Sequence, residues 1–459
     1  MRSIARHSSS FRDPSGFLFL DNGQIYRQIN QSYKEHYDQL MNSGLYKKLA
    51  DEGLLCFHHE ICGLQNLSQE AYKVIKPEVI PFISYPHEWC FSQLKDAALT
   101  TLKIQQVALE NDMILKDASA YNIQFKDGKP VLIDTLSFKK YSEGTSWVAY
   151  RQFCQHFLAP LALMACKDVR LNQLHRVYID GIPLDLASTL LPIGTYFKLQ
   201  ILIHIHIHAH FQKRYSDKEL RSRKISISRD RLISLMDTLK SAVTKLKWDQ
   251  KKTEWSSYYD DLSYTEAALN QKQRLIEAFI GDIQPTMVWD IGANTGFFSR
   301  VASKSRIPTV SMDYDHSVVD TNYSRCKENN ERHILPLVID LTNPTSSFGW
   351  SNEERMSLLD RGPVDVVLAL ALIHHLRVSN NTPLGSVAQL FSNICKWLII
   401  EFIPKTDPKF LRLIANREDI FPDYTKDNFE RLFGRYFTVK RQEPIYGSER
   451  DLYLMERIY

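Results

Sequence analysis

Residues 287–303, MVWDIGANTGFFSRVAS, combine an apolar run with one acid and two glycines in the order D-x-G-x-x-x-G: Asp290, Gly292 and Gly296. Glycines at this spacing let the chain turn sharply and let a ligand lie against bare backbone. A helix that begins after such a turn presents free N–H groups, which favour a neighbouring carboxylate or phosphate. The motif therefore indicates a nucleotide-type ligand, although a dinucleotide-binding fold would use a similar loop.

Acidic side chains follow the next two apolar runs. PTVSMDYD (308–315) reaches Asp313, which lies 23 residues after Asp290, and ILPLVIDLTNP (334–344) reaches Asp340. An acid at the first position can accept both hydroxyls of a ribose, and an acid at the second is placed to meet an adenine amino group. Because the carboxyl ends of parallel strands meet at one edge of a sheet, we expect both acids to lie beside the glycine loop.

Two histidines follow a fourth apolar run, VDVVLALALIHHL (364–376), and a fifth run, KWLIIEFIPKTDP, reaches Glu401. Imidazole titrates close to neutral pH, so it can take a proton from a reacting hydroxyl or amine. His374 and His375 are therefore candidate catalytic residues. The alternative is that one of them packs in the core with a backbone partner while the other acts as a general base.

Taken in this order, the glycine loop, the two acids and the HH-L run resemble class I S-adenosylmethionine-dependent methyltransferases, over residues 280–459. The resemblance implies S-adenosyl-L-methionine as the cofactor and an oxygen or nitrogen nucleophile as the methyl acceptor. Such a displacement mainly needs positioning, and it needs a base only if the acceptor must lose a proton. The loop departs from the family at its centre, where Ala293 and Asn294 replace commoner glycines. No metal is expected.

The resemblance also implies roles for single residues. Asp290 could simply cap the loop through backbone N–H groups, a role that coexists with binding. The residues that the resemblance places at the cofactor are Asp290, Gly292, Asn294 and Gly296 at the methionine part, Asp313 at the ribose and Asp340 at the adenine.

Alternating strands and helices must position these residues. The pattern from about residue 250 predicts an α/β domain with a Rossmann-like, doubly wound sheet over 250–459. Its C-terminal run, from residue 417 onward, predicts a last helix and an antiparallel strand pair that close the sheet. The segment 253–280, ahead of the first strand, predicts a helix.

The first half contains a second constellation, LKDASAYNIQFKDGKPVLIDTLSF (115–138), with Asp117, Asn122 and Asp134. Their spacing resembles the catalytic loop and metal-binding acid of protein-kinase-like and aminoglycoside-phosphotransferase-like folds. By that resemblance Asp117 receives a hydroxyl proton, while Asn122 and Asp134 hold magnesium. The alternative is that all three are buried hydrogen-bonding residues of an α+β domain that holds or selects the acceptor.

The kinase-like match has gaps. No glycine-rich nucleotide loop and no V-A-I-K strand is evident, although Arg27 lies on a comparable strand. Lys116 stands where His or Arg precedes the catalytic aspartate, and Thr-Leu-Ser follows Asp134 in place of Phe-Gly. We therefore predict an α+β domain over 16–245, for which a protein-kinase-like fold is the candidate that the resemblance implies.

Local patterns predict the elements of this first domain. Helices dominate from Glu88 to about Leu246, with a long one from Phe91. The shorter elements are a hairpin in 16–29 turning at Asp21-Asn22-Gly23, a broken helix over 33–53, strands at 54–61 and 79–84, and a hairpin turning at Asp127-Gly128.

Two further segments have ordinary interpretations. LLIHIHIHAHF carries His204, His206, His208 and His210, which form i,i+4 pairs on a helix or one face of a strand. With alternating apolar residues and no carboxylate inside the run, a half-buried amphipathic segment is favoured over a metal site. The basic, serine-rich stretch 212–231 is interpreted as an exposed linker or solvated helix face, since no aromatic platform for nucleic acid is interleaved.

Gross composition agrees with two domains. The chain has 459 residues, a net charge of +4 and 44% hydrophobic residues, which excludes a disordered chain and gives no sign of a polyanionic partner. No apolar run is long enough to span a membrane. Residues 1–15 are expected to form a disordered leader rather than a secretory signal. Seven scattered cysteines indicate reduced thiols and a cytoplasmic protein.

The whole chain resembles a bacterial family of two-domain class I methyltransferases, some of them nodulation-related. Phrases that carry this resemblance are YPHEWCFSQLKDAALTTL, YRQFCQHFLAPLALMA and REDIFPDYT. The leading hypothesis is a methyltransferase whose acceptor is an unidentified small molecule, glycan or protein; nucleic acid is disfavoured because no N-P-P-Y-type motif follows the fourth strand. The alternatives are a kinase-like phosphotransferase or ATP-binding domain fused to a methyltransferase, and a non-catalytic binding module. The oligomeric state stays open.

Overall fold

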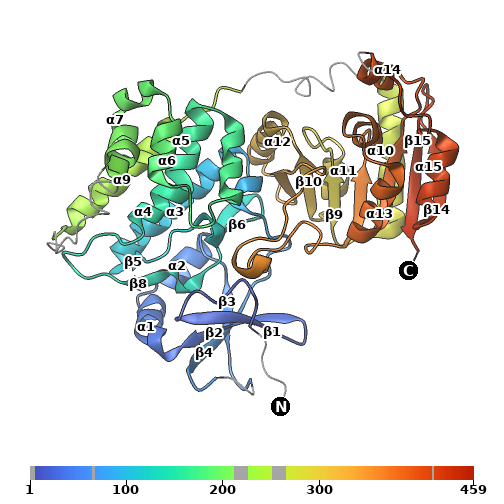
Figure 1. Ribbon diagram of the computed structural model, residues 1–459. Helices are drawn as coiled ribbons and strands as arrows, with labels where there is room; N and C mark the ends of the chain where they lie inside the picture. Colours follow the sequence, from blue (N-terminus) through green and yellow to red (C-terminus); the bar gives the residue numbers. More distant parts are fainter. Residues whose placement is uncertain (1–5, 65–67, 211–225, 251–264, 416–417, 459) are drawn as a thin grey trace. The chain divides into compact units, whose positions relative to one another are not determined.

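A computed structural model describes residues 6–64, 68–210, 226–250, 265–415 and 418–458 (Figure 1). The chain divides into two compact units. Unit 1 comprises Met1–Asp249 and Ser347–Arg355, and unit 2 comprises Gln250–Ser346 and Met356–Tyr459. In the part of the chain that the structure describes, no helix is long and apolar enough to cross a membrane.

Unit 1 begins with a four-stranded antiparallel sheet. The strands are β1 (Gly16–Asp21), β2 (Gln24–Asn30), β3 (His58–Ile61) and β4 (Ala71–Pro77), in the order β1-β2-β4-β3. The predicted first hairpin is confirmed. Its turn residues, Asn22 and Gly23, both have positive φ, as the tight turn between twisted strands requires.

One predicted strand is wrong. Residues 79–84, VIPFIS, form no strand, and β4 lies before them at 71–77. Pro81 has no N–H to donate to a neighbouring strand, which disfavours strand pairing in this run. The apolar character that suggested a strand instead serves the core, where Phe82 is buried.

Two helices of unit 1 lie between β2 and β3, and most of the others follow the sheet in the chain. The predicted broken helix is α1 (Lys34–Asn42) and α2 (Leu45–Asp51), separated at Gly44, whose φ of 78° ends the first helix. The long predicted helix is α3 (Phe91–Glu110), confirmed. The remaining helical segments that the structure describes in unit 1 are η1 (Gln31–Tyr33), η2 (Pro86–Glu88), η3 (Ala120–Asn122), η4 (Thr135–Ser137), α4 (Tyr150–Phe153), η5 (Cys154–Leu158), α5 (Ala159–Cys166), η6 (Val169–Arg176), α6 (Leu184–Leu190), η7 (Ile193–Phe197), α7 (Leu199–Ile201), η8 (Leu202–Ile207), α9 (Arg229–Lys245) and η9 (Trp350–Asn352).

Two short strand pairs carry the loop with the second constellation. β5 (Met113–Leu115) pairs with β8 (Phe138–Lys140), and β6 (Ile123–Lys126) pairs with β7 (Lys129–Leu132). The predicted turn at Asp127-Gly128 is confirmed, since both residues have positive φ. Asp117, Asn122 and Asp134 all lie between β5 and β8. The two antiparallel pairs, β5 with β8 and β6 with β7, bring them together.

The histidine-rich run is helical rather than extended. His204 and His206 are buried on α7–η8, where His204 Nδ1 lies 2.8 Å from Tyr150 Oη and His206 Nδ1 lies 2.7 Å from Ser188 Oγ. Ile203 and Ile207 are exposed, so the expected half-buried segment is confirmed. No group of three or more His, Cys, Asp or Glu among the described residues could hold a metal ion.

Three expectations fall partly outside the described residues. The basic stretch 212–231 lies outside them up to residue 225, and residues 1–5 of the expected leader also lie outside. The helix expected over 253–280 lies outside them up to residue 264, and its described part is α10 (Glu266–Ile283). Residues 6–15 do not behave as a disordered leader. They are held by contacts such as the hydrogen bonds His7 N to Leu18 O (2.8 Å) and Arg12 Nε to Glu354 Oε1 (2.8 Å).

Unit 2 is built on a seven-stranded mixed sheet. β9 to β13 are parallel, β15 is antiparallel to β13, and β14 is antiparallel to β15. The predicted C-terminal helix and antiparallel strand pair are confirmed. The strands, in spatial order, are β11 (Ile334–Val338), β10 (Thr309–Asp313), β9 (Val288–Ile291), β12 (Val364–Ala369), β13 (Cys395–Phe402), β15 (Asp451–Arg457) and β14 (Phe437–Pro444).

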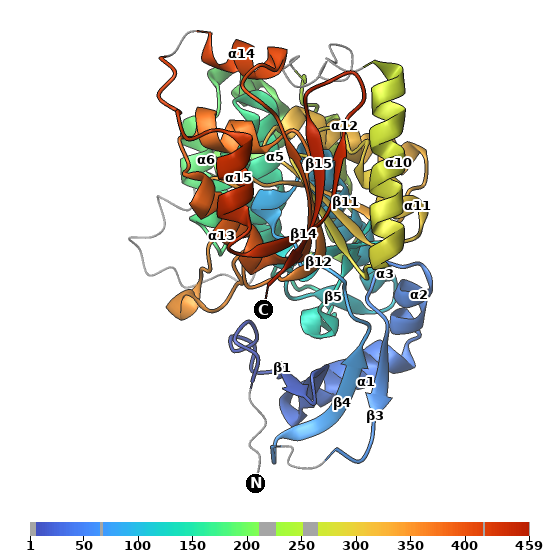
Figure 2. The same cartoon turned by 90° about the vertical axis from the view of Figure 1, so that its right-hand side faces the viewer.

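Helices cover both faces of this sheet. Figure 2 shows α10 and α11 on one side and α13 and α15 on the other. Buried side chains of β9, β12 and β13 pack against α10, as Val288, Val366 and Ile399 do against Ile276 and Phe279. Burying each such side chain contributes about 1.5–3 kcal/mol. The helices of unit 2 are α10 (Glu266–Ile283), α11 (Ser299–Lys304), α12 (His316–Glu328), η10 (His375–Ser379), α13 (Leu384–Ile394), α14 (Pro408–Ile414) and α15 (Lys426–Phe433).

Candidate functional site

A cavity of about 460 Å³ lies in unit 2 at the carboxyl ends of β9, β10, β11 and β12. Its size is in the range of small-molecule sites, about 300–1,000 Å³. Gly296 and His374 are not among the described residues that line it. The candidate site residues that do line it are Asp290, Gly292, Asn294, Asp313, Asp340 and His375.

The two glycines of the loop have different surroundings. Both have positive φ, 75° at Gly292 and 76° at Gly296. A Cβ on Gly292 would lie 3.2 Å from Leu372 Cδ1 at the cavity wall, whereas a Cβ on Gly296 would lie 2.5 Å from Asn322 Nδ2 of α12. The missing side chain of Gly292 therefore leaves room for Leu372 at the cavity wall. The missing side chain of Gly296 lets the loop pack closely against α12.

Asp313 ends β10 and turns its carboxylate toward the glycine loop. Oδ2 accepts the backbone N–H of Asn294 (2.9 Å), and Oδ1 accepts the backbone N–H of Asp315 (3.0 Å). Only 8% of the residue is exposed. Burial raises the pKa of this carboxyl to about 6. The acid is thus oriented before any ligand arrives.

Asp290 lies one residue before the end of β9 and is buried more deeply. It is 2% exposed, and its Oδ2 accepts the hydroxyl of Ser299 at 2.6 Å. Burial raises the pKa of Asp290 to about 6 as well. Asp340 is exposed by comparison, and its Oδ1 accepts the backbone N–H and the hydroxyl of Thr342 (2.8 and 2.6 Å).

The two histidines do not lie at the end of a strand as expected. β12 ends at Ala369, and His374 and His375 lie on a helical turn beyond it. His375 lines the cavity, and burial lowers the pKa of its imidazole to about 4, so it is neutral at pH 7. His374 is 2% exposed, and its ring centroid lies 4.1 Å from that of His375. Burial lowers its pKa well below the usual value.

Lys272 is a cavity residue that sequence reasoning missed. It lies on α10, lines the cavity, and donates from Nζ to Glu401 Oε2 at 2.6 Å. The same Oε2 accepts the backbone N–H of Ala371 (2.9 Å), so Glu401 ties the lysine to the loop after β12. The available signal was spacing, because Lys272 stands between Ala268 and Ile276 on the buried face of the helix.

Glu401 also takes part in a wider buried network. Arg450 Nη1 lies 3.3 Å from Glu401 Oε1, and its guanidinium forms hydrogen bonds with Asp407 at 2.6 and 3.0 Å. Lys272, Glu401, Arg450 and Asp407 therefore balance two positive and two negative charges in the interior.

The second constellation is brought together in unit 1. The side chain of Asn122 forms a hydrogen bond with Asp117, and burial, followed by the charge of Asp134, raises the pKa of Asp117. Asp134 forms an ion pair with Arg27 Nη2 (2.6 Å) and accepts the Ser137 hydroxyl (2.5 Å). The three residues named from the sequence and the arginine of β2 thus form one cluster.

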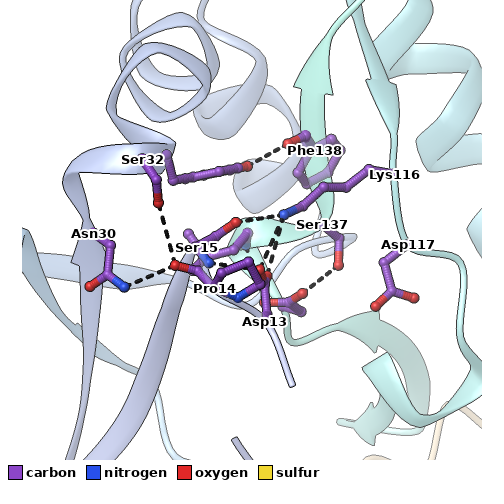
Figure 3. A network of polar contacts seen from close by, with 12 residues as sticks. Asp13, Pro14, Ser15, Asn30, Ser32, Lys116, Asp117, Ser137 and Phe138 are labelled. Carbon is purple, nitrogen blue, oxygen red and sulfur yellow. Dashed lines mark hydrogen bonds and ion pairs between the residues drawn. The ribbon is translucent and has the colours of Figure 1, made fainter. Parts of the chain in front are cut away.

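The chain near the N-terminus lies beside this cluster (Figure 3). Lys116 Nζ donates to Ser15 Oγ at 2.7 Å and forms an ion pair with Asp13 at 3.3 Å. Asn30 Nδ2 donates to the carbonyl of Pro14 at 2.9 Å. No sequence pattern indicated that these residues would meet.

No protein-family model matches the chain. The chain is 33% identical to the nodulation protein NoeA of Rhizobium meliloti (strain 1021) over 460 residues, which cover 98% of this chain and 96% of that protein.

Solved structures are similar at low TM-scores. The bifunctional kinase-methyltransferase WbdD is 17% identical, with 41% of this chain and 39% of that chain covered and a TM-score of 0.30. The magnesium protoporphyrin IX methyltransferase ChlM from Synechocystis PCC 6803 is 17% identical, with 44% and 92% covered and a TM-score of 0.33.

The order of the strands defines the topology of unit 2. Three strands lie in the order β11-β10-β9, and the chain then returns to the other side of β9 to continue as β12-β13-β15-β14. This is a Rossmann-like sheet whose strand order reverses at β9, and an α+β unit precedes it in the chain. Similarity to NoeA extends over both units, and the chain belongs to the family of the nodulation protein NoeA.

Proposed function

We propose that unit 2 binds S-adenosyl-L-methionine in the 460 Å³ cavity and transfers its methyl group to an oxygen or nitrogen nucleophile. The observation that carries this proposal is the meeting of the glycine loop with the acids of two successive strands, Asp313 and Asp340, at one cavity. A pre-oriented carboxylate beside bare backbone suits a ribose, whose two hydroxyls are donors.

The residues fit the parts of this cofactor. Asp313 would accept the ribose hydroxyls, Asp340 would meet the adenine amino group, and Asp290 would face the methionine ammonium. When bound, the cofactor supplies a methyl group on a positively charged sulfur. His375 is neutral and lines the cavity, so it can take the proton that a hydroxyl or ammonium acceptor loses.

The acceptor we propose is a small molecule, a glycan or a protein. A nucleic-acid acceptor is disfavoured because the chain has a net charge of only +4. We propose that unit 1 shapes or recruits the acceptor, since the residues of the cofactor site all come from unit 2.

Calorimetric titration of the full chain with S-adenosylhomocysteine tests the proposal. We expect binding by the wild type and a loss of about tenfold or more in Asp313→Asn, because a hydrogen bond to a charged group contributes about 1.5–3 kcal/mol. The matched control is Asp282→Asn, an exposed acid of α10 whose carboxylate pairs with Arg441. Absence of binding by the wild type would contradict the proposal and favour an inert binding module.

A second candidate function is phosphotransfer by unit 1, and a specific observation favours it. Arg27 is buried, and its Nε has no hydrogen-bond partner among the described residues, beside the cluster of Asp117, Asn122 and Asp134. A buried guanidinium that pairs with Asp134 through Nη2 and, within the described residues, keeps a free Nε–H is suited to a phosphate with its divalent cation. In that arrangement Asp117 would accept the hydroxyl proton.

Titration with Mg-ATP tests the second candidate. We expect the wild type to bind, and we expect Asp134→Asn to lose binding while Asp168→Asn, an acid of the same unit that pairs with Arg170 on the surface, keeps it. If the wild type does not bind Mg-ATP, the second candidate is wrong, and the cluster is a buried hydrogen-bonding network.

A further inference from the structure

Lys272 stands out in the cavity by its charge. Among the described residues that line the cavity, it is the one lysine or arginine, and the acids there are Asp290, Asp313 and Asp340. Lys272 is 1% exposed, so its ammonium is not a surface charge that water screens.

The position of Lys272 along the cavity also matters. The carboxyl of Asp290 is close enough to influence the protonation of the Lys272 ammonium, and Lys272 Nζ lies 4.6 Å from the centre of the Phe298 ring. Lys272 is therefore at the end of the cavity that holds Asp290. Asp313 and Asp340 follow β10 and β11, which lie on the other side of β9 from β12.

This distribution of charge matches an amino-acid arm. Such an arm carries an ammonium and a carboxylate on one carbon, so its site needs an anion and a cation side by side. Asp290 supplies the anion and Lys272 supplies the cation. No other described lysine or arginine lines the cavity, so a carboxylate bound at a different place would meet no cationic side chain there.

Glu401 fixes the lysine without excluding this role. Its Oε2 holds Lys272 Nζ at 2.6 Å and the Ala371 N–H at 2.9 Å, which sets the lysine against the loop that borders the cavity. A buried ion pair is weak evidence for stability, because apolar residues of similar volume often replace such a pair at no cost. A lysine at a cavity wall has a use that an apolar residue cannot supply.

We propose that Lys272 binds the carboxylate of the donor's amino-acid arm and so makes the site selective for a donor that carries this carboxylate. The inference rests on the proposed function and assigns one residue within that site. Lys272 is a binding residue in this role, and Glu401 is the positioning residue that orients it.

The experiment compares two ligands that differ only in the carboxylate. S-adenosylhomocysteine and its decarboxylated analogue, S-adenosyl-3-thiopropylamine, are titrated calorimetrically into the full-length wild type and into Lys272→Met. We expect the wild type to prefer the carboxylate ligand by roughly tenfold or more, and Lys272→Met to bind both ligands within about twofold of each other.

Controls separate binding from folding. Lys272→Met leaves Glu401 buried without its partner, so the double variant Lys272→Met/Glu401→Gln is measured as well and should show the same loss of preference. Lys396→Met removes a half-exposed lysine that pairs with Asp365, and it should keep the wild-type ratio.

The outcomes test the proposed function and the role of Lys272 separately. A wild type that binds neither ligand overturns the proposed function, and the role of Lys272 falls with it. A wild type that binds both ligands equally, or lysine variants that lose affinity for both ligands by the same factor, overturn the role of Lys272 alone. A lost preference in the single and double variants, with the ratio kept in Lys396→Met, supports it.

Discussion

Asp290 and Asp313 titrate near neutral pH because both carboxyls are buried at the ends of adjacent strands. Burial raises the pKa of each to about 6, above the usual value of 3.8. A ligand with an ammonium and ribose hydroxyls favours the ionised form of both acids. Binding of such a ligand therefore releases protons at pH values below 6, and its affinity must fall as the solution is acidified.

We predict that S-adenosylhomocysteine binds progressively more weakly as the pH falls from 7 to 5. The limiting slope is about tenfold per pH unit for each acid that must ionise. Titration calorimetry at half-unit steps measures it, and Asp290→Asn should flatten the profile because one titrating group is removed. An affinity that stays constant over this range, or that rises on acidification, would contradict the assignment of these acids.

His375 gives a second prediction at the residue scale. Burial lowers the pKa of its imidazole to about 4, so its protonation state is constant between pH 5.5 and 8. A base with a pKa near 4 is weaker than one whose pKa matches the working pH, so we expect His375→Ala to reduce methyl incorporation into a cell extract by about 10²-fold, the lower end of the usual contribution of a general base, while S-adenosylhomocysteine affinity changes little. Equal losses of incorporation and affinity would show that the residue only shapes the cavity.

The residues of the cavity differ in how far the sequence could predict them. Asp313 and Asp340 were placed correctly at the carboxyl edge, because each follows an apolar run whose strand is parallel to its neighbours. Lys272 was not predicted, because its spacing from Ala268 and Ile276 indicates a buried position on α10 but neither the cavity nor the partner of its ammonium. Its role depends on Glu401, which is 129 residues away in sequence and meets it only through packing.

The turn after β9 shows how one element positions the site. Gly296 has a φ of 76°, and its missing Cβ leaves room for Asn322 and Arg300, which would lie 2.5 Å and 2.8 Å from it. A side chain there would be strained by backbone conformation and by contact at once. The loop that carries Asn294 therefore depends on this glycine, although Gly296 does not line the cavity.

We predict that Gly296→Ala destabilises the protein by about 1–3 kcal/mol, since left-handed backbone costs about 1–2 kcal/mol and the contact adds to it. Gly281→Ala is the matched control, because Gly281 lies in α10 and an added Cβ would meet nothing within 4 Å. That change should raise stability by about 0.5–1 kcal/mol. Denaturant midpoints measure both effects, and opposite signs are required.

Helices and strands were predicted correctly where all the residues that determine them lie within the segment itself. The hairpin at Asn22-Gly23 and the long helix α3 have their turn residues or periodicity within the segment itself. The strand expected at residues 79–84 failed, because an apolar run shows burial but not the hydrogen-bonding partner that makes a strand. The helical turn that carries His374 and His375 was also read as strand end, since apolar residues continue past Ala369 without interruption.

At the scale of the whole molecule, the chain crosses between its units more than once. Residues 347–355 belong to unit 1, although the chain on both sides of them belongs to unit 2. Within unit 1, the ring of Phe348 lies 5.6 Å from those of Tyr85 and His87, and Glu354 accepts two hydrogen bonds of 2.8 Å from Arg12. No motif in the sequence predicted this, since the segment follows β11 as an ordinary connection.

The two units are therefore not separable at residue 250 without loss. We predict that a fragment of residues 250–459 is less stable and more prone to association than a matched fragment in which a Gly/Ser linker replaces 347–355. In the first fragment Phe348 loses its aromatic neighbours, and Glu354, which is 3% exposed in the full chain, loses Arg12. Size-exclusion chromatography and thermal unfolding compare them. Fragments that elute and unfold alike would contradict the prediction and show that unit 2 tolerates exposure of this segment.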